Sequence, residues 1–381
     1  MNSVAFGGMA PVSSVQFIPT KLSRVRWLES QSHELLRRLP ESFVTGSCEE
    51  PEANEVSEWS VSCVALEEGL YEGAEHLKDS VEFKQVAAVQ VAGDVTDLQV
   101  CPVSDGRVLA STSAGLVHGV RFHTSARGGR VGTIFATWKQ LHNTGNCDYP
   151  SNAVSIQIEG DRFLSGGSDG SVCECDMNRG APECRLGVLG DASSPILCLA
   201  YVARQQAVAG NASGQLLGMD TRKPCDSWSW CAGGLAESGK ALTALAPHPS
   251  QQHLVAVGTQ QGTVAFVDLR NTKTPLGLAE ATTSLAVHHG PVWEARFHPS
   301  YPDNLFTCSE DGCVFFWDAA SSFSKAPGSK DSNSRSSNGS VRSVLGEENV
   351  FPVNSVDVLA DRLLCAVDNH ALHYIQTLNI K

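Results

Sequence analysis

The sequence is short of charge, of long apolar runs and of helical periodicity, and each shortage excludes a class of protein. Charged residues make up 18% of the 381 residues, below the roughly 25% of an average globular chain, which argues against a charged helical rod or coiled coil. No run of about 18 uninterrupted apolar residues occurs, so no membrane-spanning helix is indicated. The first 20 residues carry no basic residue, and Gly7, Gly8 and Pro11 interrupt them. We therefore expect no signal peptide.

Basic residues are also scarce. The chain has 28 Lys and Arg against 41 Asp and Glu, a net charge of −13, and its one short basic cluster is Lys21, Arg24 and Arg26. An acidic surface repels phosphate groups, so we expect no direct binding to nucleic acid or to anionic membranes and favour another protein as the partner. The 42% of hydrophobic residues and the 34 glycines are enough for a globular core.

The thirteen cysteines are odd in number and lack the spacing of a disulfide framework. This usage favours a reduced intracellular protein in which buried cysteines act as small apolar residues. Cys173 and Cys175, with Cys184 further on, resemble half of a zinc site, but no second pair and no suitably placed histidine follow. His370 and His373 lack a metal-binding motif, and His370 is expected in a turn. We expect no metal site.

The chain does contain an internal repeat. His248-Pro249-Ser250 matches His298-Pro299-Ser300 at an offset of 50 residues, and Asp268 matches Asp318 at the same offset. Turn glycines recur at intervals of 44 to 55 residues; they are Gly115, Gly170, Gly214, Gly262 and Gly312. Such regular self-similarity predicts an architecture built from repeated units.

Each unit consists of short strands. In the clearest unit, Val292–Phe297, Leu305–Cys308 and Val314–Trp317 alternate as strands, and Asp311-Gly312 predicts a hairpin between the last two. Helical periodicity is limited to a single turn at Glu34–Leu39. Four-stranded units that begin near a His and end in Trp-Asp resemble WD-repeat β-propellers. We expect an all-β, seven-bladed propeller forming one domain over residues 1–381. Its units lie at about 15–65, 90–125, 150–180, 192–225, 240–272, 287–320 and 350–375.

The two ends of the chain and three long segments complete this prediction. The last unit supplies only about three strands, so we expect Val12–Thr20 to add the fourth strand and close the last blade. Residues 321–346 are rich in serine and predict a flexible insertion between the sixth and seventh blades. Residues 66–85 and 122–148 exceed a minimal blade and predict long loops or a lengthened outer strand, with Trp138 near its end.

The sixth unit contains candidate residues for a buried hydrogen-bonded chain. In propellers of this kind a Trp, a Ser or Thr, a His and an Asp form it, and the matching residues are Trp317, Thr307 or Ser309, His288 and Asp311. We expect a structural role, because buried polar groups persist when they are bonded. Other units place different residues at the Trp position, namely Val120, Cys175, Met219 and Val267, so we expect the chain to be missing there.

Motifs of catalysis are weak. Gly166 to Gly170 matches G-x-S-x-G, but the motif needs a strand-to-helix elbow, and here a strand follows. The sequence has no phosphate-binding loop and no dinucleotide fingerprint. We therefore expect no enzyme activity, no catalytic residue and no cofactor.

Several longer sequence segments are more specific for one family than a Trp-Asp ending. They are Arg24 to Trp27; His248 to His253 with Asp268-Leu269-Arg270; Trp293 to Ser300 running into Leu305 to Gly312; and Val353 to Leu359 after the serine-rich segment. In these segments the chain resembles the family of forty-three-kilodalton nucleoporins, WD-repeat subunits of the Y-shaped outer-ring complex of the nuclear pore.

The resemblance implies a non-enzymatic scaffold that is a monomer on its own and docks onto a helical-solenoid nucleoporin of the complex's short arm. It also implies residence at the nuclear pore in the nuclear envelope, and roles in pore assembly and in transport of mRNA and protein. Location at the kinetochore during cell division would carry over as well. The resemblance does not identify the blade or face that docks.

Two other functions remain open. A substrate receptor of a cullin-type ubiquitin ligase would use Arg222 and Arg270, which follow Asp220 and Asp268 in a D-x-R pattern without the Trp. A reader of peptides or histone tails would use the top face of the propeller, with Trp293 as an anchor at its rim. Trp293, Arg222 and Arg270 are therefore the candidate partner contacts.

Overall fold

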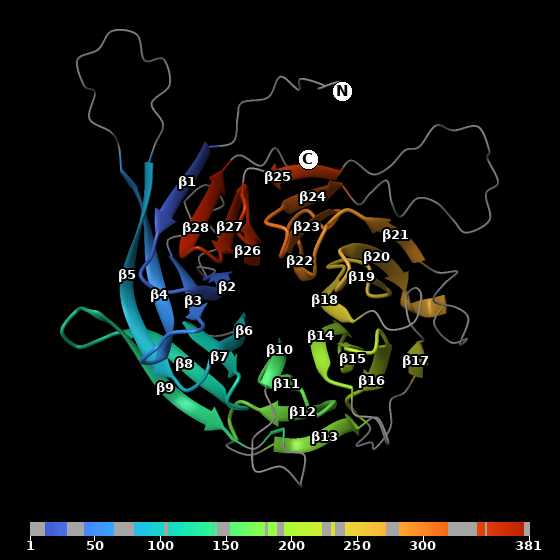
Figure 1. Ribbon diagram of the computed structural model, residues 1–381. Helices are drawn as coiled ribbons and strands as arrows, with labels where there is room; N and C mark the ends of the chain where they lie inside the picture. Colours follow the sequence, from blue (N-terminus) through green and yellow to red (C-terminus); the bar gives the residue numbers. More distant parts are fainter. Residues whose placement is uncertain are drawn as a thin grey trace, which may run out of the picture.

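Seven four-stranded antiparallel sheets stand around a central axis as the blades of a propeller (Figure 1). This computed structural model describes residues 12–28, 42–64, 80–102, 106–139, 141–142, 153–179, 182–188, 194–222, 230–232, 241–271, 282–318, 341–346 and 349–376. The all-β, seven-bladed fold predicted from the repeat is confirmed. The one helical element in these ranges is a short 3-10 turn, η1 (Leu269–Asn271). In the part of the chain described, no helix has the length and apolarity to span a membrane.

The first four blades follow one another along the chain, each running from an inner strand at the axis to an outer strand at the rim. Blade 1 contains β2 (Leu22–Trp27), β3 (Ser42–Ser47), β4 (Asn54–Val64) and β5 (Ser80–Val91). Blade 2 contains β6 (Val95–Val100), β7 (Arg107–Thr112), β8 (Val117–Thr124) and β9 (Arg130–Trp138). Blade 3 contains β10 (Ala153–Glu159), β11 (Arg162–Gly167), β12 (Ser171–Asp176) and β13 (Pro182–Val188). Blade 4 contains β14 (Ile196–Ala203), β15 (Gln206–Asn211), β16 (Leu216–Asp220) and β17 (Trp230–Ala232).

The last three blades keep the same plan until the chain ends. Blade 5 contains β18 (Leu242–Pro247), β19 (Leu254–Thr259), β20 (Thr263–Asp268) and β21 (Thr282–Ala286). Blade 6 contains β22 (Val292–Phe297), β23 (Asn304–Ser309), β24 (Val314–Asp318) and β25 (Val341–Leu345). Blade 7 takes only β26 (Val353–Leu359), β27 (Arg362–Val367) and β28 (Ala371–Gln376) from the end of the chain. We call the end of the ring where the inner strands begin the top, and the opposite end the bottom.

The N-terminal strand closes the ring as the sequence predicted. β1 (Val12–Phe17) pairs antiparallel with β28, from Val12 opposite Gln376 to Phe17 opposite Ala371. The Gln16 side chain then joins this outer strand to blade 1: its Nε2 donates to the carbonyl oxygen of Phe83 over 2.7 Å, and its Oε1 accepts from the Phe83 N–H over 2.8 Å. The joint is therefore bonded on both sides of β1.

Outer strands account for most of the difference between the expected and observed blade boundaries. The first unit was expected to end near residue 65, but blade 1 continues to Val91 through β5. The second was expected to end near residue 125, but β9 extends it to Trp138, which agrees with the alternative of a lengthened outer strand. The repeat pattern covers the first three strands of each blade, because the turn glycine and the terminal Asp lie there. The expected helical turn at residues 34–39 and most of segment 66–85 lie outside the described residues.

The serine-rich segment differs from its prediction in position. Its end, Val341–Leu345, forms β25 and pairs with β24 as the outer strand of blade 6. The segment therefore lies inside blade 6, between its third and fourth strands, and its last part is regular sheet. Val341 packs against one inter-blade apolar cluster, and Val344 and Leu345 pack against the next. The many serines in the segment led us to predict a flexible insertion and to overlook these three apolar positions. Residues 319–340 lie outside the described residues.

The tight turn between the second and third strands requires a left-handed backbone. All five glycines of the repeat have φ between 73° and 82°. Gly312 has a further constraint, because a Cβ atom there would collide with the carbonyl oxygen of Asn349, in the connection that enters blade 7. Blades 1 and 7 lack the glycine and use Glu49 (φ 57°) and His370 (φ 63°) in this turn. His370 is thus a turn residue, as expected.

The hydrophobic core is divided into clusters between neighbouring blades, and the richest in aromatic rings lies where the ring closes. It joins Trp27, Phe43 and Phe83 of blade 1 to Tyr374 of blade 7. The ring of Phe83 meets that of Tyr374 edge to face, with centroids 5.9 Å apart. Such pairs add roughly 0.5–1.5 kcal/mol to the burial of area. Aromatic packing therefore connects the first and last blades where the two ends of the chain meet.

Deleting residues 1–20 should lower the melting temperature by more than about 5 °C, because β28 loses its six-residue partner and Phe83 loses its bonds to Gln16. Deleting only residues 1–11, which precede β1, is the matched control and should leave the melting temperature close to that of the full chain. Differential scanning calorimetry of the three proteins measures both effects. Equal melting temperatures for the two truncations would contradict closure by β1.

Candidate functional site

A chain of hydrogen bonds crosses blade 6 from the turn before β22 to β24. His288 Nε2 lies 2.9 Å from Thr307 Oγ1, and Trp317 Nε1 donates to the same hydroxyl oxygen over 3.0 Å. His288 Nδ1 lies 3.2 Å from a carboxylate oxygen of Asp311. Burial lowers the pKa of His288, and the Asp311 carboxylate offsets this only in part. The ring is therefore neutral at pH 7, and the four residues hold the blade together.

Ser309, the alternative to Thr307, stands outside this chain. Its hydroxyl oxygen accepts a hydrogen bond from the backbone N–H of Asp311 over 3.2 Å and fixes the turn between β23 and β24. Thr307 is fully buried and Ser309 is as well. The two hydroxyls therefore have different structural tasks, one within the blade and one at its turn.

Blade 3 contains a second chain of the same kind. His142 Nε2 lies 2.9 Å from Ser165 Oγ, and its Nδ1 lies 3.1 Å from Asp169 Oδ1. Cys175 occupies the Trp position, so the chain ends at Ser165. The expectation that units without the Trp lack the chain is therefore wrong for blade 3. In blade 1 the opposite half remains: Trp59 Nε1 donates to Thr45 Oγ1 over 2.9 Å.

His142 was missed because of its spacing. It stands eleven residues before Ala153, the first residue of its inner strand, whereas His288 stands four residues before Val292. The signal that could have found it is Asp169-Gly170, which occupies the same turn as Asp311-Gly312. In both turns the Asp carboxylate lies beside a histidine that precedes the inner strand.

The inner strands are joined around part of the ring by a repeated side-chain contact. The third side chain of an inner strand accepts a hydrogen bond from the fourth backbone N–H of the next. The pairs are Asp97 Oδ2 with Ile156 N at 3.0 Å, Glu294 Oε2 with Val356 N at 3.0 Å, and Ser355 Oγ with Val25 N at 3.2 Å. The third side chain thus satisfies a backbone donor that the sheets themselves leave free.

A second inter-blade contact uses the second residue of each inner strand. The second side chain of an inner strand donates to the first carbonyl oxygen of the next blade's inner strand. The pairs are Thr96 with Ala153 at 2.5 Å, Thr243 with Val292 at 2.7 Å, and Asn354 with Leu22 at 2.9 Å. Together the two contacts fix neighbouring inner strands in register, which makes the frame of the ring rigid.

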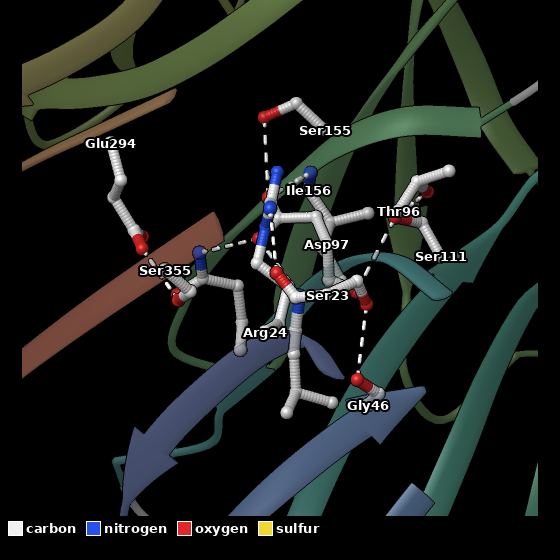
Figure 2. A network of polar contacts seen from close by, with 12 residues as sticks. Ser23, Arg24, Gly46, Thr96, Asp97, Ser111, Ser155, Ile156, Glu294 and Ser355 are labelled. Atoms are coloured by element: carbon white, nitrogen blue, oxygen red, sulfur yellow. Dashed lines mark hydrogen bonds and ion pairs between the residues drawn. The ribbon is translucent and has the colours of Figure 1, made fainter. Parts of the chain in front are cut away.

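Polar side chains of blades 6, 7, 1 and 2 line one side of the central axis, and we call them the polar wall. Arg26 is at its centre. Its Nη2 lies 2.6 Å from Glu294 Oε1 and 3.5 Å from Asp97 Oδ1, and its side chain is only 4% exposed. Arg26 belongs to blade 1, Glu294 to blade 6 and Asp97 to blade 2, so the contacts span four neighbouring blades across the closure. Figure 2 shows Asp97 with Ser155 and Ile156 of blade 3, and Glu294 with Ser355 of blade 7.

The charges of this wall set the protonation of its acids. Burial alone would raise the pKa of Glu294, but the positive charges of Arg26 and Arg296 outweigh it and hold that pKa at about 2. At Asp357 the balance is reversed, and burial raises its pKa despite the same two arginines. Glu294 is thus the firmly ionised partner of Arg26. Removing either of them would leave a charge buried in the ring.

The opposite wall of the axis is apolar. The positions that carry charge in blades 1, 2, 6 and 7 are taken in blades 4 and 5 by Cys198, Ala200, Ala244 and Ala246, all of them buried. The axis therefore has a charged half and a small-residue half. The charged half is the one that contains the closure of the ring.

The described cysteines and the serine motif do not form a catalytic arrangement. Burial raises the pKa of Cys308 and of Cys365, so both thiols stay protonated near neutral pH. Ser168 lies in the turn between β11 and β12, and a strand follows where a nucleophile elbow needs a helix. Within the described ranges no group of three His, Cys, Asp or Glu side chains could hold a metal ion.

The three candidate partner contacts do not lie together. Arg222 and Arg270 follow the ends of β16 and β20 at the bottom, and each is paired with its own strand-end carboxylate. Arg222 Nε lies 2.9 Å from Asp220, and Arg270 Nε lies 2.9 Å from Asp268. Trp293 is the second residue of β22, at the top, and is 38% exposed. The two arginines therefore resemble ordinary strand-end pairs, whereas Trp293 offers an apolar surface.

Arg222 also borders a polar groove of about 380 Å³ between the bottom turns of blades 3 and 4. Several of its lining residues are bonded within the protein: Arg162 lies 3.3 Å from Glu174, and the Gln205 N–H donates to Glu159. The groove is thus a seam between two blades.

Comparison with known proteins gives results that fit this geometry. The family described as WD domain, G-beta repeat matches residues 280–318, the unit that contains the His288 chain. Nucleoporin Nup43 of Mus musculus is 27% identical over 402 aligned positions, which cover 95% of this chain and 98% of that protein. Nucleoporin Nup43 of Homo sapiens is 26% identical, and the alignment covers 94% of this chain and 97% of that protein. The nuclear pore complex protein nup43 of Dictyostelium discoideum is 35% identical over 74 positions, 19% of this chain.

Glu294→Gln and Arg26→Met should each lower the free energy of unfolding by about 3 kcal/mol, because each leaves the other charge buried without its nearest partner. Arg296 still lies 3.1 Å from Glu294 and Asp97 3.5 Å from Arg26, which keeps the loss at the low end for a broken buried pair. The double variant should lose much less than the sum of the two, since it leaves neither charge behind. Urea unfolding measures all three. Asp220→Asn with Arg222→Met, at an exposed pair, is the control and should leave the unfolding midpoint unchanged. Additive losses at Arg26 and Glu294 would show that the pair is not coupled.

Stability should fall in two stages as the pH is lowered. Burial lowers the pKa of His288 and of His298 below 6.5, so the unfolded chain takes up protons first, and their contribution, complete above pH 6.5, is lost below it. Glu294 and Asp169 have pKa values of about 2 against 4.5 and 3.8 when unperturbed. Their contribution is complete above those values and is lost as the pH falls toward 2. Melting temperatures measured from pH 8 to pH 3 test this, and a flat profile from pH 7 to pH 5 would refute the first stage.

Proposed function

Because the chain is a distant homologue of nucleoporin Nup43 over nearly its whole length, we propose that it is a non-enzymatic scaffold subunit of the nuclear pore. The alignment covers more than nine-tenths of both chains, so it extends well beyond the single repeat that the WD family matches. This coverage is the observation that carries the proposal.

The construction of the ring suits such a role. A scaffold must hold partners at fixed positions, and turns carried on a rigid frame of strands do this well. The inter-blade hydrogen bonds and the buried Arg26–Glu294 pair provide that frame. β1 fills the last position in blade 7, so every blade has four strands, and a partner must bind to a surface of the finished ring.

We extend the proposal to the partner and the place. The protein docks, as a monomer, onto a helical-solenoid nucleoporin in the short arm of the Y-shaped complex and resides at the nuclear pore in the nuclear envelope. Through that assembly it supports pore formation and the transport of mRNA and protein. In mitosis it accompanies the complex to kinetochores. The family resemblance of the sequence supports these points.

Neither alternative has a specific observation in its favour. A receptor for a cullin-type ubiquitin ligase would need Arg222 and Arg270 for its adaptor, and both are engaged by the neighbouring carboxylates Asp220 and Asp268. A reader of basic peptides would need an acidic cage around Trp293. The top turns near it do carry acidic residues, but these are distributed over several blades.

Affinity purification of the tagged chain from cells, with mass spectrometry of the bound proteins, tests the proposal. Nucleoporins of the Y-shaped complex should be recovered in near-stoichiometric amounts. Arg222→Ala with Arg270→Ala should recover the same nucleoporins, because each side chain pairs with its own strand-end carboxylate and the proposal assigns neither a contact with a partner. Recovery of a ubiquitin-ligase adaptor without nucleoporins, and its loss in the double variant, would overturn the proposal in favour of the ligase receptor.

A further inference from the structure

Four of the exposed large apolar side chains share one end of the ring and two adjacent blades. Val350 is 82% exposed, Phe17 71%, Phe351 48% and Trp293 38%. Val350 and Phe351 lie in the connection that enters β26 of blade 7, Phe17 ends β1 of the same blade, and Trp293 belongs to β22 of blade 6. We call these four residues the joint stripe.

The register of blade 7 places Phe17 on the side facing blade 6. Phe17 is opposite Ala371, which belongs to the apolar cluster shared by blades 6 and 7. Its neighbour Gln16 points the other way, toward blade 1, because its amide bonds to Phe83. Side chains alternate along a strand, so Phe17 continues the cluster between blades 6 and 7 outward into solvent. β1 is the outer strand, which puts Phe17 at the rim.

Trp293 occupies the inner end of the same joint. At the equivalent position of other inner strands, Thr96, Thr243 and Asn354 reach the first residue of the next blade's inner strand. By that register Trp293 faces the start of β26. Phe351 stands two residues before β26, and its connection is pinned to blade 6, because Asn349 Nδ2 donates to the Gly312 carbonyl oxygen over 3.0 Å. The stripe thus runs from rim to axis along one joint.

The charge around the stripe has one sign. In the described top turns of blades 6, 7 and 1, the acidic residues are Glu49, Glu50, Glu52, Glu310, Asp311 and Asp368, and Lys21 is the one lysine or arginine. Lys21 is already paired, with Glu49 at 2.8 Å and Asp368 at 2.9 Å. The sequence adds Glu347 and Glu348 just before Asn349. A partner with matching charge must therefore present lysine or arginine beside its apolar residues.

We propose that the joint stripe is the docking surface of this protein, and that it binds an amphipathic helix whose apolar face is flanked by lysine or arginine. The proposal rests on the proposed scaffold function. The stripe crosses the strands of the blades, so it presents no continuous strand edge to which an extended segment could pair. Four strands spaced about 4.8 Å apart span roughly 14 Å, which corresponds to about ten residues of helix. The helix therefore contacts the stripe through apolar residues at positions i, i+3 or i+4, and i+7.

The test uses the full-length protein and two matched double variants. Phe17→Ser with Val350→Ser removes the two most exposed members of the stripe. Val131→Ser with Ile134→Ser is the control, since these side chains on the outer strand β9 are 39% and 41% exposed and lie away from the joint. Calorimetry first establishes that both variants melt within a few degrees of the wild type. Binding to each purified helical-solenoid nucleoporin of the Y-shaped complex is then measured by isothermal titration.

The stripe variant should raise the dissociation constant at least tenfold, and the control should leave it within twofold. Raising the salt concentration from 50 to 300 mM should also weaken wild-type binding, because the flanking charges are screened. A photo-reactive amino acid at position 351 should crosslink to a helix with the stated pattern. Wild-type binding that the stripe variant retains in full would overturn the docking surface and leave the scaffold function standing. Wild-type protein that binds none of the nucleoporins would overturn the scaffold function itself.

Discussion

A closed ring of sheets must satisfy the backbone groups on the edge of each inner strand where no other strand of its own blade can reach them. In this protein the side chains of the preceding blade do so, through the second and third positions of the inner strand. The same positions then decide what else the axis can contain. Where they carry acids, arginines accumulate to balance them, and Arg26 becomes the shared partner of Glu294 and Asp97. Where they carry Ala and Cys, as in blades 4 and 5, the strands pack directly.

The polar wall and the aromatic cluster are concentrated on the same side of the ring, around blades 6, 7, 1 and 2. This is the side where one blade is assembled from both ends of the chain. Covalent continuity holds the other blades together, whereas blade 7 depends on non-covalent contacts for its fourth strand. Three contacts cross the closure of the ring: the edge-to-face rings of Phe83 and Tyr374, the double hydrogen bond of Gln16, and the Arg26–Glu294 pair. Apolar packing supplies most of the attraction, and the directional contacts fix the register.

The sequence was most informative where a residue type has one conformational or bonding reason to be present. Asp311-Gly312 and the terminal Trp317 located three strands of blade 6, and the regular turn glycines located most other blades. Outer strands such as β5 and β25 have no such marker, because they are half-exposed and tolerate serine and charge, so their positions were wrong or omitted. His142 escaped because extra residues separate it from its strand. The Arg26–Glu294 pair joins residues 268 apart, and no local pattern specifies which distant acid meets which arginine. The joint stripe combines three separate elements, and only the topology brings them to one joint.

Pairing of β1 with β28 also determines when this protein can finish folding during its synthesis. β1 is synthesised before every other strand of the ring, and its partner β28, ending at Gln376, is made more than 350 residues later. At about 5–20 residues per second, the interval is on the order of 20–70 s. During that time β1 has no sheet to join, and the blades already made lack their closing contact. The nascent ring therefore stays open until β28 has been made, and its closure is the last step in assembling the blades.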